Sequence, residues 1–383
     1  MENSPLILLA TASIMLRDRL AALLDGKGRL MLAGSSEQAK PLLRPYPPHL
    51  CILDASLPGG EALTMLHRLR EGARGDDSYV VILTADDDAV TRDNAFLLGA
   101  DDVLRMPSEL PDLAPRLGIA LRHATLMRRL RNYGQRLEAE MSLVAELQLR
   151  MLPTSTPFFP GVHIETLYRP SQLASGDYYD HLPLPGGDGV RILMADASGH
   201  GARAAFLMSI VRTVVHTSQV RGLGLAQLFR ELGSHLMGII GGESDFVTMF
   251  AGDIHFGRNQ LEYINAGHCP ALLGANDGTI QRLGPTAPLL GFFESQYTIS
   301  ATPFTPGSGL LLFTDGIHDC ANASGKRMGQ EKFLTLAEHI MRTESDVLPT
   351  LEQAVCAAMG DNATYDDDVA ALYLRRETED AAL

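Results

Sequence analysis

The chain has 383 residues, of which 45% are hydrophobic and 20% are charged, and its formal net charge at pH 7 is −14. This length predicts two domains and a connector, and the apolar content is sufficient for each domain to bury a core. The negative charge argues against a nucleic-acid partner, because phosphate backbones bind basic surfaces; it is compatible with binding of divalent cations.

The cysteines and the apolar runs indicate the compartment. Cys51, Cys269, Cys320 and Cys356 are far apart and lack the spacing of zinc or disulfide frameworks. Residues 1–5 lack the basic start of a signal peptide, and no apolar run has the length of a membrane span. We therefore expect a cytoplasmic protein with reduced thiols and no membrane partner.

Residues 1–118 alternate short apolar runs with amphipathic stretches, a pattern typical of parallel α/β sheets. The predicted strands are 6–10, 31–34, 50–53, 79–83 and 102–104, and the clearest helices are 15–24 and 61–70. We predict a small doubly wound sheet with helices on both faces.

Residues 119–152 are rich in Arg, Glu and Leu and predict one long helix. Its apolar stripe, with spacings of three and four, consists of Leu126, Leu130, Tyr133, Leu137, Val144, Leu147 and Met151. Such a stripe either pairs with a second copy, giving a homodimer through helix 119–152, or packs on the chain's own domains. Gly134 and Glu140 weaken the stripe, and the step from Leu152 to Pro153 ends the helix.

Residues 153–376 predict a second domain in which strands and helices are segregated. The predicted strands are 162–169, 190–195, 248–254, 260–264, 309–313 and 369–374, and the predicted helices are 200–219, 225–240, 332–340 and 346–359. This segregation indicates an α+β layered domain. Residues 377–383 are polar, and we expect a disordered tail.

Carboxylates recur at strand ends in this second domain. Asp177 lies in the turn-like run SGDYYD, Asp196 follows an apolar strand, Asp315 follows another, and Asp367 lies just before the last strand. A single Asp after a strand is usually part of a turn, whereas four at sheet edges can converge on one site. Oxygen-only clusters suit Mg²⁺ or Mn²⁺, and two such ions can activate water for attack on phosphorus.

The order of these motifs resembles the bacterial metal-dependent protein phosphatases of the PPM (type 2C) family, of the sporulation and stress-response kind. The matching stretches are 147–153 (LQLRMLP), 175–180 (SGDYYD), 196–201 (DASGHG), 246–250 (FVTMF), 265–268 (NAGH), 288–291 (PLLG), 313–317 (FTDGI) and 367–370 (DDVA). The resemblance implies an α-β-β-α sandwich. It also implies an enzyme that hydrolyses phosphoserine or phosphothreonine in a regulatory protein, such as an anti-sigma-factor antagonist.

The resemblance also implies roles for individual residues. Two Mn²⁺ or Mg²⁺ ions would be bridged by Asp196, with Asp177 and the Ala197 carbonyl on one ion and Asp315 and Asp367 on the other. A hydroxide bridging both ions would make the in-line attack. Asp367 is chosen over its two neighbours by alignment with the Asp-Asp-hydrophobic-Thr motif, in which this chain has Ala in place of Thr.

His200 follows Asp196 in the second motif, just before a predicted helix. It would either protonate the serine leaving group or shape the start of that helix. The sequence leaves both roles open.

Residues 5–120 resemble the response-regulator receiver family, a flavodoxin-like fold, with Asp54 at the phospho-acceptor position and Thr84 at the switch hydroxyl. Thr11 and Ala12 replace the acidic pair that holds magnesium, and Met106 replaces the lysine. Without these charges, phosphoryl transfer to Asp54 is poorly stabilised. We therefore predict a pseudo-receiver in which Asp54 is not conventionally phosphorylated.

Two functional hypotheses follow from the sequence. The first is a phosphatase regulated by the receiver-like domain through the helix. The alternative is a non-catalytic response regulator that uses the phosphatase fold as a scaffold to sequester a partner. The presence of all four carboxylates favours the enzyme.

Overall fold

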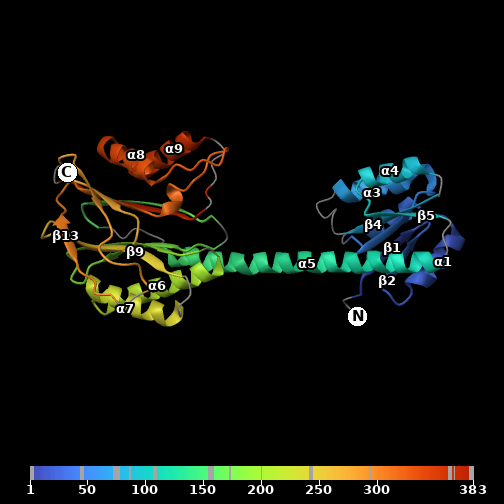
Figure 1. The fold of residues 1–383 in the computed structure, drawn as a ribbon, viewed down its shortest axis with the longest axis horizontal. Helices are drawn as coiled ribbons and strands as arrows, with labels where there is room; N and C mark the ends of the chain where they lie inside the picture. Colours follow the sequence, from blue (N-terminus) through green and yellow to red (C-terminus); the bar gives the residue numbers. More distant parts are fainter. Residues whose placement is uncertain are drawn as a thin grey trace. The chain divides into compact units, whose positions relative to one another are not determined.

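The computed structural model describes residues 4–43, 47–71, 78–85, 88–106, 110–153, 159–171, 174–199, 201–240, 245–292, 295–360, 365 and 367–378. The chain divides into two compact units, Met1–Leu137 and Glu138–Leu383. Helix α5, Leu110–Met151, contributes to both units (Figure 1). It begins well before residue 119, the predicted start of the helical linker, because its first turns carry Leu113 and Leu117, which are core residues of the first unit.

The N-terminal unit is built on a five-stranded parallel sheet with the strand order β2-β1-β3-β4-β5. Its strands are β1 Leu6–Ala10, β2 Arg29–Ala33, β3 Leu50–Asp54, β4 Tyr79–Ala85 and β5 Asp102–Met106. The three central strands consist almost entirely of buried side chains, as expected of a parallel sheet covered on both faces. This architecture confirms the predicted flavodoxin-like fold.

Helices cover the two faces of this sheet. Helix α1, Ile14–Leu24, and the start of α5 pack on one face, and α2, Ser36–Ala39, α3, Glu61–Glu71, and α4, Ala89–Leu97, pack on the other. Helix α4 was not among the predicted helices, because Ala95 is its one buried residue and its apolar periodicity is weak. It begins instead at a polar cap, where the Asp88 side chain accepts a hydrogen bond from the Thr91 amide.

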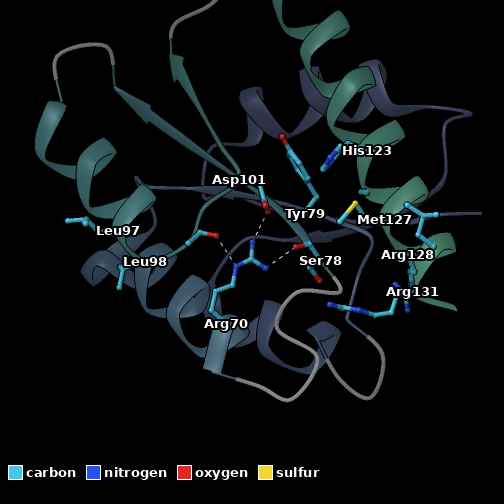
Figure 2. Close-up of a pocket in the computed structure, with 13 residues that line it drawn as sticks. Arg70, Ser78, Tyr79, Leu97, Leu98, Asp101, His123, Met127, Arg128 and Arg131 are labelled. Carbon is cyan, nitrogen blue, oxygen red and sulfur yellow. Dashed lines mark hydrogen bonds and ion pairs between the residues drawn. The ribbon is translucent and has the colours of Figure 1, made fainter. Parts of the chain in front are cut away.

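A cavity of about 690 Å³ opens in the N-terminal unit near the starts of β4 and β5 (Figure 2). On one side, the Arg70 guanidinium bonds the Asp101 carboxylate at 2.6 Å and the carbonyls of Gly99 and Ser78 at 2.8 and 2.9 Å. These bonds tie the end of α3 to the sheet. Because Asp54 is at the opposite end of the parallel strands, this cavity is separate from the phospho-acceptor position.

The C-terminal unit is a sandwich of two five-stranded sheets with two helices on each outer face (Figure 1). One sheet has the order β13-β10-β9-β8-β7, and the other has the order β12-β11-β14-β15-β6. The strands are β6 Val162–Arg169, β7 Asp177–Pro183, β8 Gly189–Ala197, β9 Val247–His255, β10 Gln260–Ala266, β11 Ala271–Gly274, β12 Ile280–Leu283, β13 Ser300–Pro303, β14 Gly309–Phe313 and β15 Val369–Arg376. The helices are α6 Ala202–Val220, α7 Leu225–Ile240, α8 Gln330–Thr343 and α9 Val347–Met359. The predicted α-β-β-α layers are confirmed.

Strand β14 shows how the layers are held together. Leu310 and Leu312 belong to the large core between the sheets, whereas Leu311 and Phe313 belong to the core under α8 and α9. Since successive side chains of a strand point to opposite faces, this fully apolar strand can serve both cores. Its carboxyl end, directly before Asp315, is therefore fixed from both sides.

Strands β7, β11, β12 and β13 were not predicted from the sequence. The important omission is β7, whose first five residues are buried although several are polar. Asp180 in this strand bonds the Tyr178 hydroxyl at 2.5 Å and His216 at 2.8 Å. Polar side chains that satisfy one another can be buried in a strand without the apolar alternation on which prediction depends.

Among the described helices, none is long and apolar enough to cross a membrane. All four cysteines are free. Residues 379–383 of the predicted tail lie outside the described residues.

Candidate metal centre

Two of the predicted carboxylates are neighbours in one sheet. Asp177, the first residue of β7, is paired in register with Asp196 near the end of β8. Directly opposed residues of antiparallel strands place their side chains on the same face, close together. Both aspartates are held by the backbone of adjacent strands, so their spacing is set by the sheet.

The other two carboxylates belong to the second sheet. Asp315 directly follows Thr314 after β14 and opens a short 3-10 turn, and Asp367 lies two residues before β15. Strands β14 and β15 are antiparallel neighbours. The end of one and the beginning of the other therefore bring Asp315 and Asp367 to the same edge.

Two side chains join the sheets at this edge. The Thr314 hydroxyl donates to Asp177 Oδ2 at 2.8 Å and also accepts from the Ala370 amide at 2.9 Å. The Asp368 carboxylate accepts from the Gly176 amide at 2.9 Å and from the Ser171 amide at 2.7 Å. These bonds join the strand ends that carry the two pairs of carboxylates.

The bonds of Asp368 bear on the choice among the three consecutive aspartates. Both of its oxygens accept hydrogen bonds from the loop before β7, and its side chain is buried. Asp367 is more exposed; one of its oxygens accepts from the Asp368 amide. Asp368 is therefore engaged in holding the loop. Asp366 and His200 lie outside the described residues.

Two glycines permit the close approach of these segments. A side chain at Gly176 would place its Cβ 2.6 Å from the carbonyl oxygen of Ala197, and one at Gly316 would collide with the backbone oxygen of Asp368. Glycine is therefore required at both positions. The approach at Gly176 also presents the Ala197 carbonyl beside the Asp177 loop.

The carboxylates perturb one another electrostatically. Burial raises the pKa of Asp177 well above its usual value, and the neighbouring charge of Asp196 raises it further. The pKa of Asp196 rises to about 7, again through burial first and then through Asp315 and Asp367. The pKa values of Asp315 and Asp367 are also raised, mainly by burial. Charges of one sign, removed from water, are unfavourable unless cations accompany them.

The donor set fits hard divalent cations in kind. It consists of four carboxylates and a backbone carbonyl, the oxygen donors that Mg²⁺ and Mn²⁺ prefer. Within the described residues, no three Asp, Glu, His or Cys side chains are placed so that they could hold a metal ion among them. The fit therefore rests on the kind of donor and on the convergence of these strand ends from two sheets.

The receiver-like site has a different character. Asp54 ends β3 and is buried; its Oδ2 accepts a 2.5 Å hydrogen bond from the Thr11 hydroxyl, and its Oδ1 accepts from the Ser56 amide at 2.9 Å. Thr11 is thus both the replacement for an acidic residue and a direct partner of Asp54. Thr84 is buried, and its hydroxyl has no hydrogen-bond partner among the described residues.

Three residues near the metal centre were not recognised from the sequence as positioning groups: Thr314, Asp368 and Gln148. Thr314 and Asp368 stand beside predicted ligands, but sequence alone does not distinguish a side chain that binds an ion from one that binds backbone. Gln148 lies in the LQLRMLP stretch and bonds the backbone of Ser175. Its signal is a polar residue between two leucines near the helix end.

Comparison with known proteins identifies two families in the chain. The family model for stage II sporulation protein E (SpoIIE) matches residues 186–377, which is half of the chain. The model for the response regulator receiver domain matches residues 7–117. The two matches fall on the sandwich unit and on the parallel-sheet unit.

Individual relatives agree with this division. Phosphoserine phosphatase RsbP of Bacillus subtilis is 30% identical, over 47% of this chain and 45% of RsbP. Phosphoserine phosphatase RsbU of the same organism is 24% identical, over 65% of this chain and 73% of RsbU. The solved RsbU and RsbW domains of Rv1364c from Mycobacterium tuberculosis are 26% identical with a TM-score of 0.51, covering 59% of this chain and 63% of that one. The chain spans less than half the length of the first curated relatives it matches.

We expect that Asp54 does not accept a phosphoryl group from acetyl phosphate, because a neutral hydroxyl bonds it where receivers carry an acid. Intact-mass measurement should show no phosphorylated species for the natural chain. The triple variant Thr11→Asp, Ala12→Asp and Met106→Lys restores the missing charges and should gain a phosphorylated species. Phosphorylation of the natural chain at Asp54 would contradict the expectation.

Proposed function

Because the chain belongs to the stage II sporulation protein E family and carries a receiver domain, we propose that it is a metal-dependent protein serine/threonine phosphatase. The observation that carries this proposal is the convergence of four carboxylates from two sheets at one edge of the sandwich. The relatives RsbP and RsbU, which carry the name phosphoserine phosphatase, support the same reaction.

The proposed ligands follow from the positions of the carboxylates. Asp196, which is paired in register with Asp177 and whose pKa is raised by burial and by Asp315 and Asp367 of the other sheet, would contact both ions. Asp177 and the Ala197 carbonyl would hold one ion. Asp315 and Asp367 would hold the other. Two bound Mg²⁺ or Mn²⁺ ions would supply an activated water for in-line attack on phosphorus.

The protein's own groups would hold this site in place. Thr314 fixes one oxygen of Asp177, which leaves the other oxygen to face an ion. Asp368 fixes the amide of Gly176 and so the start of β7. For His200 both predicted roles, shaping the start of the helix and donating a proton to the leaving group, remain predictions.

The proposed substrate is a phosphorylated regulatory protein, as the family resemblance implies, with an anti-sigma-factor antagonist as the first candidate. A variant that binds the phosphoprotein but hydrolyses it poorly, such as Asp315→Asn, would retain it for identification by phosphosite mapping. We propose that the receiver-like domain regulates this activity by docking, without phosphorylation of Asp54.

We further propose a homodimer formed through α5. Every residue from 131 to 140 is exposed, and within this stretch Tyr133 and Leu137 expose 67% and 61% of their surface. A helix that leaves apolar side chains of one stripe in water is stabilised when a second copy covers them.

The phosphatase proposal predicts hydrolysis of p-nitrophenyl phosphate and of a phosphoserine peptide by the whole chain with Mn²⁺. Asp196→Asn should lower kcat/KM by at least about a hundredfold, because it removes a charge placed between both ions. The matched control is Asp188→Asn, in an exposed turn, which should leave the rate unchanged.

A natural chain that binds Mn²⁺ yet hydrolyses neither substrate would favour the scaffold hypothesis. Equal rates for Asp196→Asn and the natural chain would refute the ligand assignment.

The dimer proposal predicts a two-chain species in sedimentation velocity. Leu137→Lys should give monomers, since a buried leucine contributes about 2 to 5 kcal/mol and a charge cannot replace it. Gln135→Lys, which adds the same charge beside the stripe, should remain dimeric. A natural chain that is monomeric at all concentrations would exclude this interface.

A further inference from the structure

One side chain near the end of α5 differs from its neighbours. Gln148 exposes only 3% of its surface, whereas the adjacent Leu147 and Leu149 expose 56% and 52%. A glutamine is seldom buried while flanking leucines face water, because its amide must then find partners. Its burial therefore points to a specific interaction.

The Gln148 amide binds both backbone groups of a single residue. Its Nε2 donates to the Ser175 carbonyl at 2.7 Å, and its Oε1 accepts from the Ser175 amide at 3.0 Å. Both bonds are buried. This two-point attachment fixes the position and the orientation of that peptide segment relative to α5.

Ser175 in turn lies directly at the metal-centre loop. Its hydroxyl accepts from the Asp177 amide at 3.0 Å. The next residue, Gly176, donates to Asp368 and accepts from the Ala197 amide at 3.1 Å. Three consecutive residues are therefore held by three separate elements, and α5 supplies its part through Gln148.

This loop needs such support because Asp177 lies against other carboxylates. Like charges in a buried site push apart, and a loop held only by its neighbours in sequence would yield to that force. A ligand fixed in place before the ion arrives binds it more tightly. The attachment of Gln148 opposes the displacement of Asp177.

Helix α5 is anchored at both of its ends. At its C-terminal end, Arg212 of α6 donates to the Met151 carbonyl. In the N-terminal unit, Leu117 and Leu121 of the same helix are part of the receiver core. A rotation of α5 would therefore be transmitted to the metal-centre loop through Gln148.

We propose that Gln148 is a positioning residue that couples the orientation of α5 to Asp177 and thereby sets the affinity of the metal centre for divalent cations. The inference rests on the proposed function for the identity of the site. It adds a route by which the helix controls that site.

The test is isothermal titration of the whole chain with Mn²⁺. Gln148→Leu keeps the size of the side chain and removes both hydrogen bonds, and it should raise the Kd for Mn²⁺ by about 10- to 100-fold. The matched control, Gln135→Leu, makes the same substitution at an exposed position of α5 and should leave the Kd unchanged. With saturating Mn²⁺, kcat of Gln148→Leu should approach that of the natural chain.

An unchanged Kd in a folded Gln148→Leu chain would overturn the proposal. If that variant does not fold, Gln148→Asn serves instead, because it keeps the amide but shortens the side chain. Its Kd for Mn²⁺ should rise in the same way, and an unchanged Kd would also overturn the proposal. A natural chain that binds Mn²⁺ without hydrolysing phosphoesters would refute the proposed function but not the role of Gln148. The Kd values of the natural chain and of Gln148→Leu could still be compared. A natural chain that binds no divalent cation would overturn both.

Discussion

The mutual repulsion of carboxylates gathered at one edge of the sheets is the constraint around which the sandwich unit is organised. Asp177 and Asp196 are fixed side by side by strand register, and Asp315 and Asp367 reach the same edge from the other sheet. Burial and the neighbouring charges of Asp315 and Asp367 raise the pKa of Asp196 to about 7, as expected for acidic groups placed close together. A fold that maintains this arrangement must hold each strand end firmly.

The holding groups come from parts of the chain that are distant in sequence. Thr314 joins the end of β14 to Asp177, and Asp368 joins the start of β15 to Gly176. Gln148 adds a third attachment from α5. Each of these bonds is buried and directed at the loop before β7, so the geometry of the site depends on the mutual placement of both sheets and one helix.

Sequence reasoning succeeded where the pattern is local. Apolar runs such as Leu50–Asp54 and Gly309–Phe313 are strands in the structure, and both layered folds were predicted. It failed for β7, whose polar residues are buried through mutual bonds, and it placed the start of α5 too late because Leu113 and Leu117 were not connected with the stripe further along. The hydrogen-bond partners of Asp368 and Gln148 could not be predicted from the sequence either. A side chain that binds the backbone of a residue far away in the chain produces no regular spacing of residue types.

The two halves of the chain treat their acidic sites in opposite ways. In the receiver domain a neutral threonine bonds Asp54, whereas the sandwich brings carboxylates together at one edge, where we propose that cations bind. The most direct test of that second arrangement is anomalous diffraction at the manganese edge from crystals of the whole chain grown with Mn²⁺. The account predicts anomalous peaks among Asp177, Asp196, Asp315 and Asp367. A well-ordered site without such peaks, or with manganese bound elsewhere only, would contradict it.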